Sequence, residues 1–328
     1  MDRLRSEIRR KRGRLSNQLF EGINTMSGNG NLPVGLRHKK GRNTQLRELL
    51  KRDDILVAPG AFDCISGRIV QNAGFDALYL TGAGISMSLM GAPDLGMLSY
   101  GEIISHIRRI SDAVEIPIIA DADTGYGGPL NVVRTTRDYE KAGISCIQIE
   151  DQQWPKRCGH MMNRMIAPVE EMCGRIKAAV DIRNDPDFVV MARTDSRTDH
   201  GINEAIDRMN AYIEAGADVA FVESPESVDE MKMINEQISA PTLANMVEGG
   251  RTPFIPFPEL QKLGYDLAIY PGSMGRVLGK SGTRVLEHLK QEGTTEGMAD
   301  WMFQQPDLFA LFDYKDWTEY EAKFGNRE

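Results

Sequence analysis

The chain has 328 residues, of which 41% are hydrophobic and 26% charged, a composition typical of a globular protein and not of a disordered chain. No run approaches the roughly 18 consecutive apolar residues of a transmembrane helix, so we expect no membrane partner. The net charge of −8 argues against a nucleic-acid-binding protein. Four scattered cysteines without a CxxC pair form neither a disulfide framework nor a zinc ribbon, which favours reduced thiols and a cytoplasmic protein.

Positive charge is concentrated at the N-terminus. Residues 1–42 hold eleven Lys and Arg against three acidic residues, a net charge of +8 that leaves −16 for residues 43–328. Gly, Asn and Ser crowd residues 27–31, so we predict that residues 1–42 form a basic, flexible extension. A targeting segment or a polyanion contact is the alternative to a solvated arm that packs on a neighbouring subunit or stays mobile.

Beyond residue 42, short apolar runs alternate with amphipathic stretches. The predicted strands cover residues 55–58, 77–80, 116–120, 146–149, 188–192, 219–222, 242–244 and 267–270, and helical patterns between them include 100–113, 132–142, 169–182, 202–215 and 227–238. Ala-Gly pairs at 73–74, 142–143 and 215–216 are typical of helix C-termini. Eight strand–helix units favour a single α/β domain over residues 43–328, a (β/α)₈ barrel with a C-terminal helical tail. No GxGxxG follows the first strand to support a Rossmann fold.

Polar residues follow six successive predicted strands. They are residues 81–84, Asp121 and Asp123, Glu150 and Asp151, Arg193 and Asp195, Glu223, and Asn245 with Glu248. In a barrel the carboxyl ends of the strands carry the active site. Burying so many polar groups at one mouth is costly unless they pair or bind a ligand, so we predict a polar site there.

Two carboxylates at the third strand end predict a metal site. Asp121 and Asp123 lie on one face of an extended segment and repel each other unless a cation neutralises them. Glu150, at the next strand end, is positioned to join them. Oxygen ligands of this kind suit Mg²⁺, with Mn²⁺ as an alternative. The alternative without a metal is that both aspartates cap loops or pair with arginines such as Arg193.

Cys158 lies between Lys156, Arg157 and His160 in the loop after the fourth strand. Neighbouring cations lower the pKa of a thiol, which suits a nucleophile or a proton donor. A structural role fits Cys64, Cys146 and Cys173 better, because these lie in apolar or helical patterns.

Arg193 ends the fifth strand, where a guanidinium can clamp a carboxylate with two hydrogen bonds. The alternative is an ion pair with Asp195 or Glu223. Behind Glu248, the paired glycines 249 and 250 permit a tight or mobile turn.

Five strings, in order, resemble the isocitrate lyase/phosphoenolpyruvate mutase superfamily. They are DADTGYG (121–127), EDQ (150–152), KRCGH (156–160), MARTD (191–195) and ANMVEGGRTP (244–253). KRCGH is the mark of the carbon–carbon lyases of that superfamily, and ANMVEGGRTP resembles the 2,3-dimethylmalate and 2-alkylmalate lyases. The resemblance implies a barrel whose last helix is swapped between subunits, in a homotetramer built from dimers.

The resemblance also implies roles for individual residues. Asp121 and Asp123 would bind Mg²⁺, with Glu150 acting through water. Cys158 and His160, with Tyr79, would be catalytic. Substrate contacts would come from Thr81, Gly82, Ala83, Gly159, Arg193, Glu223, Asn245 and Arg276, with Asp94 and Glu248 behind them. Methylisocitrate lyases have a further arginine where this chain has Gln305, which argues against a tricarboxylate substrate.

The function implied is cleavage of a 2-hydroxy dicarboxylate into pyruvate, or another 2-oxo acid, and a short carboxylic acid. Arg276 keeps methylisocitrate or isocitrate lyase as an alternative. Oxaloacetate decarboxylase or phosphonomutase chemistry of the same superfamily is a further alternative, which Cys158 disfavours. A non-enzymatic, oligomeric dicarboxylate-binding protein is the alternative from another class.

Overall fold

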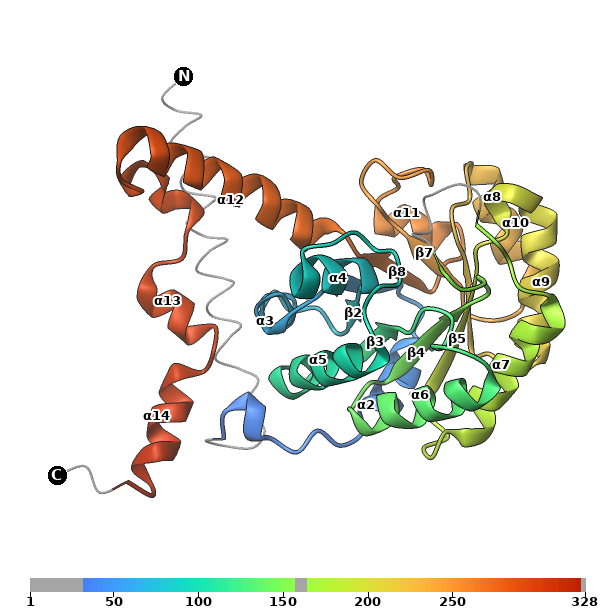
Figure 1. Cartoon of the computed structure of the whole chain (residues 1–328), viewed down its shortest axis with the longest axis horizontal. Helices are drawn as coiled ribbons and strands as arrows, with labels where there is room; N and C mark the ends of the chain where they lie inside the picture. Colours follow the sequence, from blue (N-terminus) through green and yellow to red (C-terminus); the bar gives the residue numbers. More distant parts are fainter. Residues whose placement is uncertain (1–31, 157–163, 326–328) are drawn as a thin grey trace.

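The structure, a computed structural model, describes residues 32–156 and 164–325. Its centre is a sheet of eight parallel strands in the order β6-β5-β4-β3-β2-β1-β8-β7 (Figure 1). The strands are β1 (Leu56–Ala61), β2 (Leu78–Leu80), β3 (Ile118–Asp121), β4 (Cys146–Glu150), β5 (Val189–Thr194), β6 (Val219–Val222), β7 (Leu243–Asn245) and β8 (Leu267–Tyr270). All eight lie where the sequence predicts a strand, and β6 and β8 have the predicted bounds.

The sheet curves into a barrel. Its two ends, β6 and β7, meet at a parallel bridge between Ala220 and Thr242, where the Ala220 amide donates to the Pro241 carbonyl at 2.8 Å. Sequential neighbours otherwise pair all the way round, with β8 beside β1. The predicted (β/α)₈ barrel is confirmed.

Helices cover the outside of the barrel between the strands (Figure 1). They are α3 (Cys64–Asn72), α4 (Gly82–Met90), α5 (Tyr100–Ala113), α6 (Pro129–Lys141), α7 (Val169–Ile182), α8 (Arg197–His200), α9 (Ile202–Glu214), α10 (Val228–Gln237) and α11 (Phe257–Lys262). α5 and α7 have the predicted bounds. As predicted, Gly74, Gly143 and Gly216 end helices in the left-handed region, with φ of +84°, +82° and +108°.

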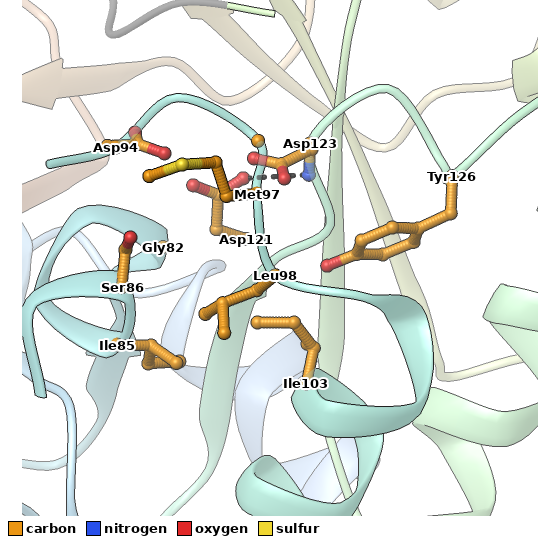
Figure 2. Close-up of a pocket in the computed structure, with 11 residues that line it drawn as sticks. Gly82, Ile85, Ser86, Asp94, Met97, Leu98, Ile103, Asp121, Asp123 and Tyr126 are labelled. Carbon is orange, nitrogen blue, oxygen red and sulfur yellow. Dashed lines mark hydrogen bonds between the residues drawn. The ribbon is translucent and has the colours of Figure 1, made fainter. Parts of the chain in front are cut away.

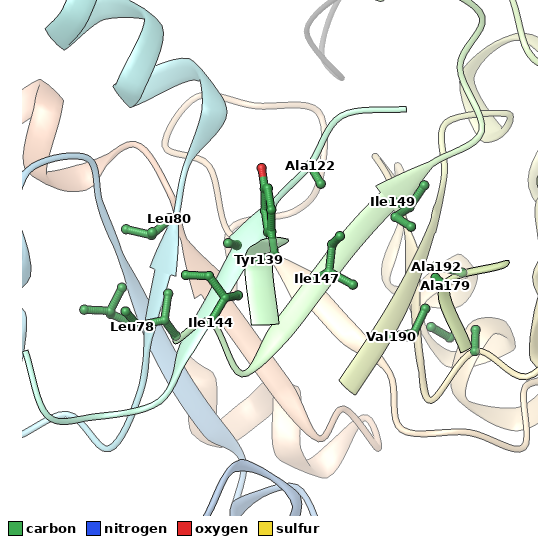
Figure 3. Packing of buried hydrophobic residues seen from close by; sticks show 14 of the residues in the cluster. Leu78, Leu80, Ala122, Tyr139, Ile144, Ile147, Ile149, Ala179, Val190 and Ala192 are labelled. Atoms are coloured by element: carbon green, nitrogen blue, oxygen red, sulfur yellow. The ribbon is translucent and has the colours of Figure 1, made fainter. Parts of the chain in front are cut away.

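Alternation along the strands divides the core into two layers. On β4, Ile147 and Ile149 face outward and pack with Tyr139 of α6 (Figure 3). Cys146 faces the barrel interior with residues such as Phe221, and its burial fits the predicted structural role. The interior is thus filled below the mouth, so a ligand can enter only from the carboxyl ends of the strands.

Part of the predicted flexible extension is packed on the barrel. The described part of residues 1–42 includes the 3₁₀ helix η1 (Val34–Leu36), and Arg37 pairs with Glu115 at 3.0 Å. Lys39 and Arg42 donate to carbonyls at the end of α5, since cations are favoured at helix C-termini. The described part of the predicted extension, residues 32–42, thus contacts the barrel. Residues 1–31 lie outside the described residues, and the domain boundary at residue 42 stays a prediction.

The α2 helix (Arg42–Leu49) lies at the other end of the barrel from the strand carboxyl ends. Leu46 and Leu49 of α2 are buried against the inner core layer. They close the bottom of the barrel, opposite the mouth.

The chain ends in an arm that projects from the barrel (Figure 1). It comprises α12 (Ser273–Glu292), the 3₁₀ helix η2 (Glu296–Trp301), α13 (Gln305–Ala310) and α14 (Tyr314–Ala322). No residue of α12 is buried, and Val277, Leu278 and Leu286 are about 60% exposed. The arm returns to its own barrel where the Leu311 carbonyl accepts from Arg68 Nε at 2.9 Å.

Candidate active site

A cavity of about 420 Å³ opens at the carboxyl ends of the strands. Ten of the predicted site residues line it: Tyr79, Thr81, Ala83, Asp94, Asp121, Glu150, Arg193, Glu223, Asn245 and Arg276. Gly82 and Asp123 line a water-sized pocket beside it, which Asp94 and Asp121 share. Cys158, Gly159 and His160 lie outside the described residues.

The loop after β3 turns sharply to present its two carboxylates. Asp123 has a φ of +48°, in the left-handed region, and its amide donates to Asp121 Oδ1 at 3.0 Å. Figure 2 shows the carboxylates of Asp94, Asp121 and Asp123 gathered above Leu98 and Ile103. Backbone strain of this kind is maintained where the surrounding structure fixes it, and it is concentrated at functional sites.

Gly82 permits a close approach to this cluster. A Cβ atom at Gly82 would lie 2.8 Å from Asp121 Oδ2, so no larger residue fits without moving the carboxylate. Gly82 and Ala83 begin α4, and the Thr81 hydroxyl accepts from the Gly84 amide at 3.4 Å. Amides of the first turn of a helix have no partner within the helix, so this end of α4 is suited to bind an anionic group such as a substrate carboxylate.

Lys156 pairs with two of the clustered carboxylates. Its Nζ lies 2.5 Å from Asp94 Oδ1 and 2.6 Å from Asp123 Oδ1, and its side chain is 3% exposed. Burial lowers the pKa of Lys156, but Asp123, Glu150 and Asp121 together raise that pKa well above its usual range. From the sequence, Lys156 was one of the cations expected to lower the pKa of Cys158. In the structure its ammonium group forms ion pairs with Asp94 and Asp123.

The charge and donor type of these residues suit a divalent cation, with Asp121 and Asp123 as the two protein ligands predicted from the sequence. Asp94, Asp121 and Asp123 carry three negative charges, and Lys156 supplies one positive charge, which leaves the cluster at −2. Burial raises the pKa of Asp123 to about 6, with Lys156 opposing that rise. Among the described residues, Asp123 Oδ1 has the ion pair with Lys156 at 2.6 Å as its polar contact. Hard oxygen donors with excess negative charge are the ligands that Mg²⁺ prefers.

Glu150 does not join Asp121 and Asp123 directly. Among residues 32–156 and 164–325, no group of three His, Cys, Asp or Glu side chains is placed to hold a metal ion. Glu150 Oε2 instead lies 3.6 Å from Arg193 Nε, while Oε1 is buried without a hydrogen-bond partner among the residues described. Burial raises the pKa of Glu150 well above its usual range, although Arg193 lowers it. A water-mediated role for Glu150 stays a prediction.

Arg193 is held by carboxylates of the protein itself. Its Nε and Nη2 donate to the two oxygens of Asp195 at 2.9 and 2.8 Å, and Nη2 lies 3.3 Å from Glu223 Oε2. Glu223 in turn accepts from Asn245 Nδ2 at 3.0 Å. The ion pair with Asp195 and Glu223, one of the two alternatives drawn from the sequence, is therefore present. Of the guanidinium nitrogens, Nη1 has no hydrogen bond to a described residue and is the one left for a substrate carboxylate.

Tyr79 is a buried phenol below the cavity. Its hydroxyl donates to Gln148 Oε1 at 3.0 Å. Burial, and then the charge of Asp121, raise the pKa of Tyr79 well above its usual range. The phenol therefore keeps its proton at neutral pH and is suited to donate a hydrogen bond, not to remove a proton.

Glu248 holds the start of the arm at the rim of the cavity. Its Oε1 accepts from the Ser273 hydroxyl, and Oε2 lies 3.7 Å from Arg276 Nε. Arg276 lines the cavity with its side chain 55% exposed. The structure thus brings Glu248 against α12 beside Arg276, and its role behind the substrate contacts stays a prediction.

Sequence reasoning missed Gln148, and it missed the position of Lys156. Gln148 is fully buried and its amide lies between Tyr79 and Asp121. A signal for Gln148 was available, because it shares the inward face of β4 with Cys146 and Glu150. No signal placed Lys156, since its contacts depend on how the loops after β2, β3 and β4 meet.

Among the residues that the structure describes, no helix combines the length and the apolar character needed to span a membrane.

The sequence matches the model of the phosphoenolpyruvate phosphomutase family over residues 46–290. It is 52% identical to 2,3-dimethylmalate lyase of Eubacterium barkeri, covering 85% of this chain and 97% of that one. It is 40% identical to 2-methylisocitrate lyase of Halalkalibacterium halodurans, covering 83% and 90%.

Solved structures agree with the sequence comparisons. A crystal structure of 2,3-dimethylmalate lyase, a PEP mutase/isocitrate lyase superfamily member, matches with a TM-score of 0.82 and 37% identity, covering 87% of this chain and 95% of that one. Phosphonopyruvate hydrolase, solved in complex with oxalate and Mg²⁺, matches with a TM-score of 0.78 and 27% identity, covering 86% of this chain and 99% of that one. The chain belongs to the phosphoenolpyruvate phosphomutase family, in the PEP mutase/isocitrate lyase superfamily, and is a carbon–carbon lyase.

Proposed function

We propose that this lyase cleaves a 2-hydroxy dicarboxylate of the 2,3-dimethylmalate or 2-alkylmalate type. The observation that carries the proposal is that the cavity is lined by both polar and apolar residues. The polar lining includes Asp94, Asp121, Arg193 and Asn245. The apolar lining includes Phe62, Met87, Val247, Ile269 and Pro271. The 52% identity to 2,3-dimethylmalate lyase supports the same substrate class.

The polar lining residues suit the hydroxy-acid end of such a substrate. Amides at the start of α4 and Arg193 Nη1 are fixed donors for carboxylate oxygens. Burial of the substrate's alkyl groups against the apolar lining residues would stabilise the complex by about 0.8 kcal/mol for each CH₂. Together they orient the bond between C2 and C3 above the carboxylate cluster.

Asp121 and Asp123 would hold the metal, Mg²⁺ or alternatively Mn²⁺, with Glu150 acting through water. When bound, the metal would lower the pKa of the substrate hydroxyl and fix its orientation. Tyr79 would keep its own proton and hydrogen-bond within the site, so its part in catalysis would not be that of a base. As the C2–C3 bond breaks, the hydroxyl proton would pass to water in the cavity, and its O–H electron pair would form the C2=O bond, which leaves the 2-oxo acid and a carbanion delocalised onto its carboxylate. Cys158 then donates its thiol proton to that carbon.

Pyruvate formation tests the function. We expect turnover of 2,3-dimethylmalate in Mg²⁺ and none after EDTA treatment. The comparison substrate is 2-methylisocitrate, whose third carboxylate would have Arg276 as its only rim cation among the described cavity residues. A hydrogen bond to a charged group contributes about 1.5–3 kcal/mol, and the third carboxylate would lack such bonds beyond Arg276. We therefore expect kcat/KM for 2-methylisocitrate to be at least about 10-fold lower than kcat/KM for 2,3-dimethylmalate.

Methylisocitrate lyase is the second candidate, and Arg276 is the observation that favours it. Gln305, which stands where methylisocitrate lyases have a further arginine, begins α13 and does not line the cavity of this chain. A higher kcat/KM for 2-methylisocitrate than for 2,3-dimethylmalate would establish this candidate and refute the first. No pyruvate from either substrate, with isocitrate and oxaloacetate also inactive, would refute both.

Cys158→Ser tests the proton donor. A hydroxyl has a far higher pKa than a thiol, so protonation of the carbanion should slow and kcat should fall by about 10²-fold or more. KM should change little, because Cys158 does not hold the substrate. Cys173→Ser is the matched control: Cys173 Sγ donates to the Ala211 carbonyl at 3.6 Å, away from the cavity, and its loss should affect stability only. Wild-type turnover by Cys158→Ser would assign the acid to another residue.

The exposed apolar side chains of α12 support a swapped arm in a homotetramer. Val277, Leu278, Leu286 and Leu289 are 40–64% exposed in one chain, and a second copy would cover them. A molecular mass equal to that of one chain, measured by sedimentation equilibrium, would contradict this homotetramer.

A thiol acid at Cys158 also requires reducing conditions, so we place the enzyme in the cytoplasm.

A further inference from the structure

Gln148 joins Tyr79 to Asp121 inside the barrel. It lies on β4 with none of its surface exposed, between Ile147 and Ile149, which pack in the outer core layer. An amide buried without hydrogen bonds would cost about 1–3 kcal/mol in a protein interior. Gln148 avoids that cost because both ends of its amide have partners.

The chemistry of the partners fixes the direction of the amide. A carboxylate only accepts hydrogen bonds, so the Gln148 Nε2 group must face Asp121, where it donates to Oδ1 at 3.2 Å. Oε1 must then face Tyr79, whose hydroxyl donates to it at 3.0 Å. The two hydrogen bonds that link Tyr79, Gln148 and Asp121 are therefore compatible with only one orientation of the Gln148 amide.

These hydrogen bonds make the two carboxylate oxygens of Asp121 differ in the number of donors that they face. Oδ1 accepts from Gln148 Nε2 and from the Asp123 amide at 3.0 Å. Oδ2 accepts no hydrogen bond from any residue in the described part of the chain, and it lies on the side of Gly82. Two fixed donors on one oxygen prevent rotation of the carboxylate and present the other oxygen to the cavity.

We propose that Gln148 is a positioning residue that holds Asp121 as a metal ligand, with the Tyr79 hydroxyl fixing the amide. The inference rests on the metal site proposed above. Residues behind a metal ligand typically contribute 10- to 100-fold to metal affinity. A neutral amide is required because a carboxylate at this position would add charge to a cluster that is already negative.

Gln148→Leu tests the proposal, because leucine keeps most of the volume and removes both hydrogen bonds. The readout is Mn²⁺ affinity of the purified enzyme without substrate, measured by calorimetry. We expect affinity to fall by about 10- to 100-fold. The Mg²⁺ concentration for half-maximal activity should rise by a similar factor, while kcat at saturating Mg²⁺ falls much less. A purely structural residue would lower the melting temperature without moving either metal constant.

Tyr79→Phe keeps the proposal testable if Gln148→Leu does not fold, since it removes a single hydroxyl. It should weaken Mn²⁺ binding by a smaller factor and add nothing in the Gln148→Leu background, because both changes break the hydrogen bonds that link Tyr79, Gln148 and Asp121. Cys146→Ala, on the same face of β4, is the control: it should lower stability and leave Mn²⁺ affinity unchanged.

The two proposals fail separately. If the wild type binds no Mn²⁺ and is active in EDTA, the metal site is wrong and the role of Gln148 with it. If the wild type binds Mn²⁺ and both Gln148→Leu and Tyr79→Phe bind it equally well, only the positioning role is overturned. Full additivity in the double variant would overturn the role of Tyr79 in fixing the amide.

Discussion

Asp123→Asn should reduce kcat/KM by at least about 10³-fold, because a metal at this site contributes several kcal/mol to the transition state. The amide has nearly the same shape, so the fold should survive. Asn tolerates the left-handed backbone that Asp123 adopts at a φ of +48°. The substitution removes one negative charge from the cluster and the partner of Lys156 at 2.6 Å. Pyruvate formation and Mn²⁺ affinity should therefore be lost together.

The matched control is Asp76→Asn. Asp76 pairs with Arg52 at 3.1 Å, but both side chains are more than half exposed, so the pair contributes little. The activity and the melting temperature of the Asp76→Asn variant should match those of the wild type. If Asp123→Asn keeps more than a tenth of wild-type kcat/KM, or turns over in EDTA, then Asp123 is not a metal ligand.

The barrel was predictable because its signals are local. Strand–helix alternation, the Ala-Gly helix ends and the polar strand ends are all set by short stretches of chain. Gly143 shows the strength of such a signal, since its φ of +82° is one that other residues rarely adopt. The exposure of α12 was not predictable in this way, because α12 is amphipathic like any barrel helix, and only the structure shows that none of its residues is buried.

The candidate site was predictable as a set of residues but not as a set of pairs. The sequence predicted Asp121, Arg193 and Glu223 at the mouth, and left open whether Arg193 binds substrate or a protein carboxylate. The pairing depends on side-chain directions set by loops that meet in three dimensions. Glu150 illustrates this: it is the last residue of β4, close to the predicted strand end, yet its carboxylate lies against Arg193 and does not join Asp121 and Asp123.

The contacts of the extension with the barrel were not predictable for the same reason. Lys39 and Arg42 read as part of a solvated basic run. In the structure they donate to carbonyls of Ser111 and Glu115, at or just beyond the end of α5. A helix C-terminus far along the chain attracts cations, and no local pattern around residue 42 records that it is there.

Lys156→Met should destabilise the metal-free enzyme by about 3–5 kcal/mol, the usual cost of removing one partner from a buried ion pair. Lys156 is 3% exposed and lies against Asp94 and Asp123, which would be left facing each other without a cation. The pKa of Asp123, already about 6, should rise further once the Lys156 charge that lowers it is gone. Urea unfolding in EDTA measures the loss.

Divalent metal should restore much of that stability, because Lys156 and a metal compete for Asp123. We therefore expect Mg²⁺ to raise the free energy of unfolding more in Lys156→Met than in the wild type, and Mn²⁺ to bind more tightly. Activity should nevertheless fall, since a cation next to the reacting bond is lost. Lys262→Met is the control, because Lys262 is 71% exposed in a surface pair with Glu259 and should change neither stability nor metal response. Equal destabilisation of Lys156→Met with and without Mg²⁺ would show that the carboxylate cluster does not take up the metal, and that Lys156 serves only to neutralise it.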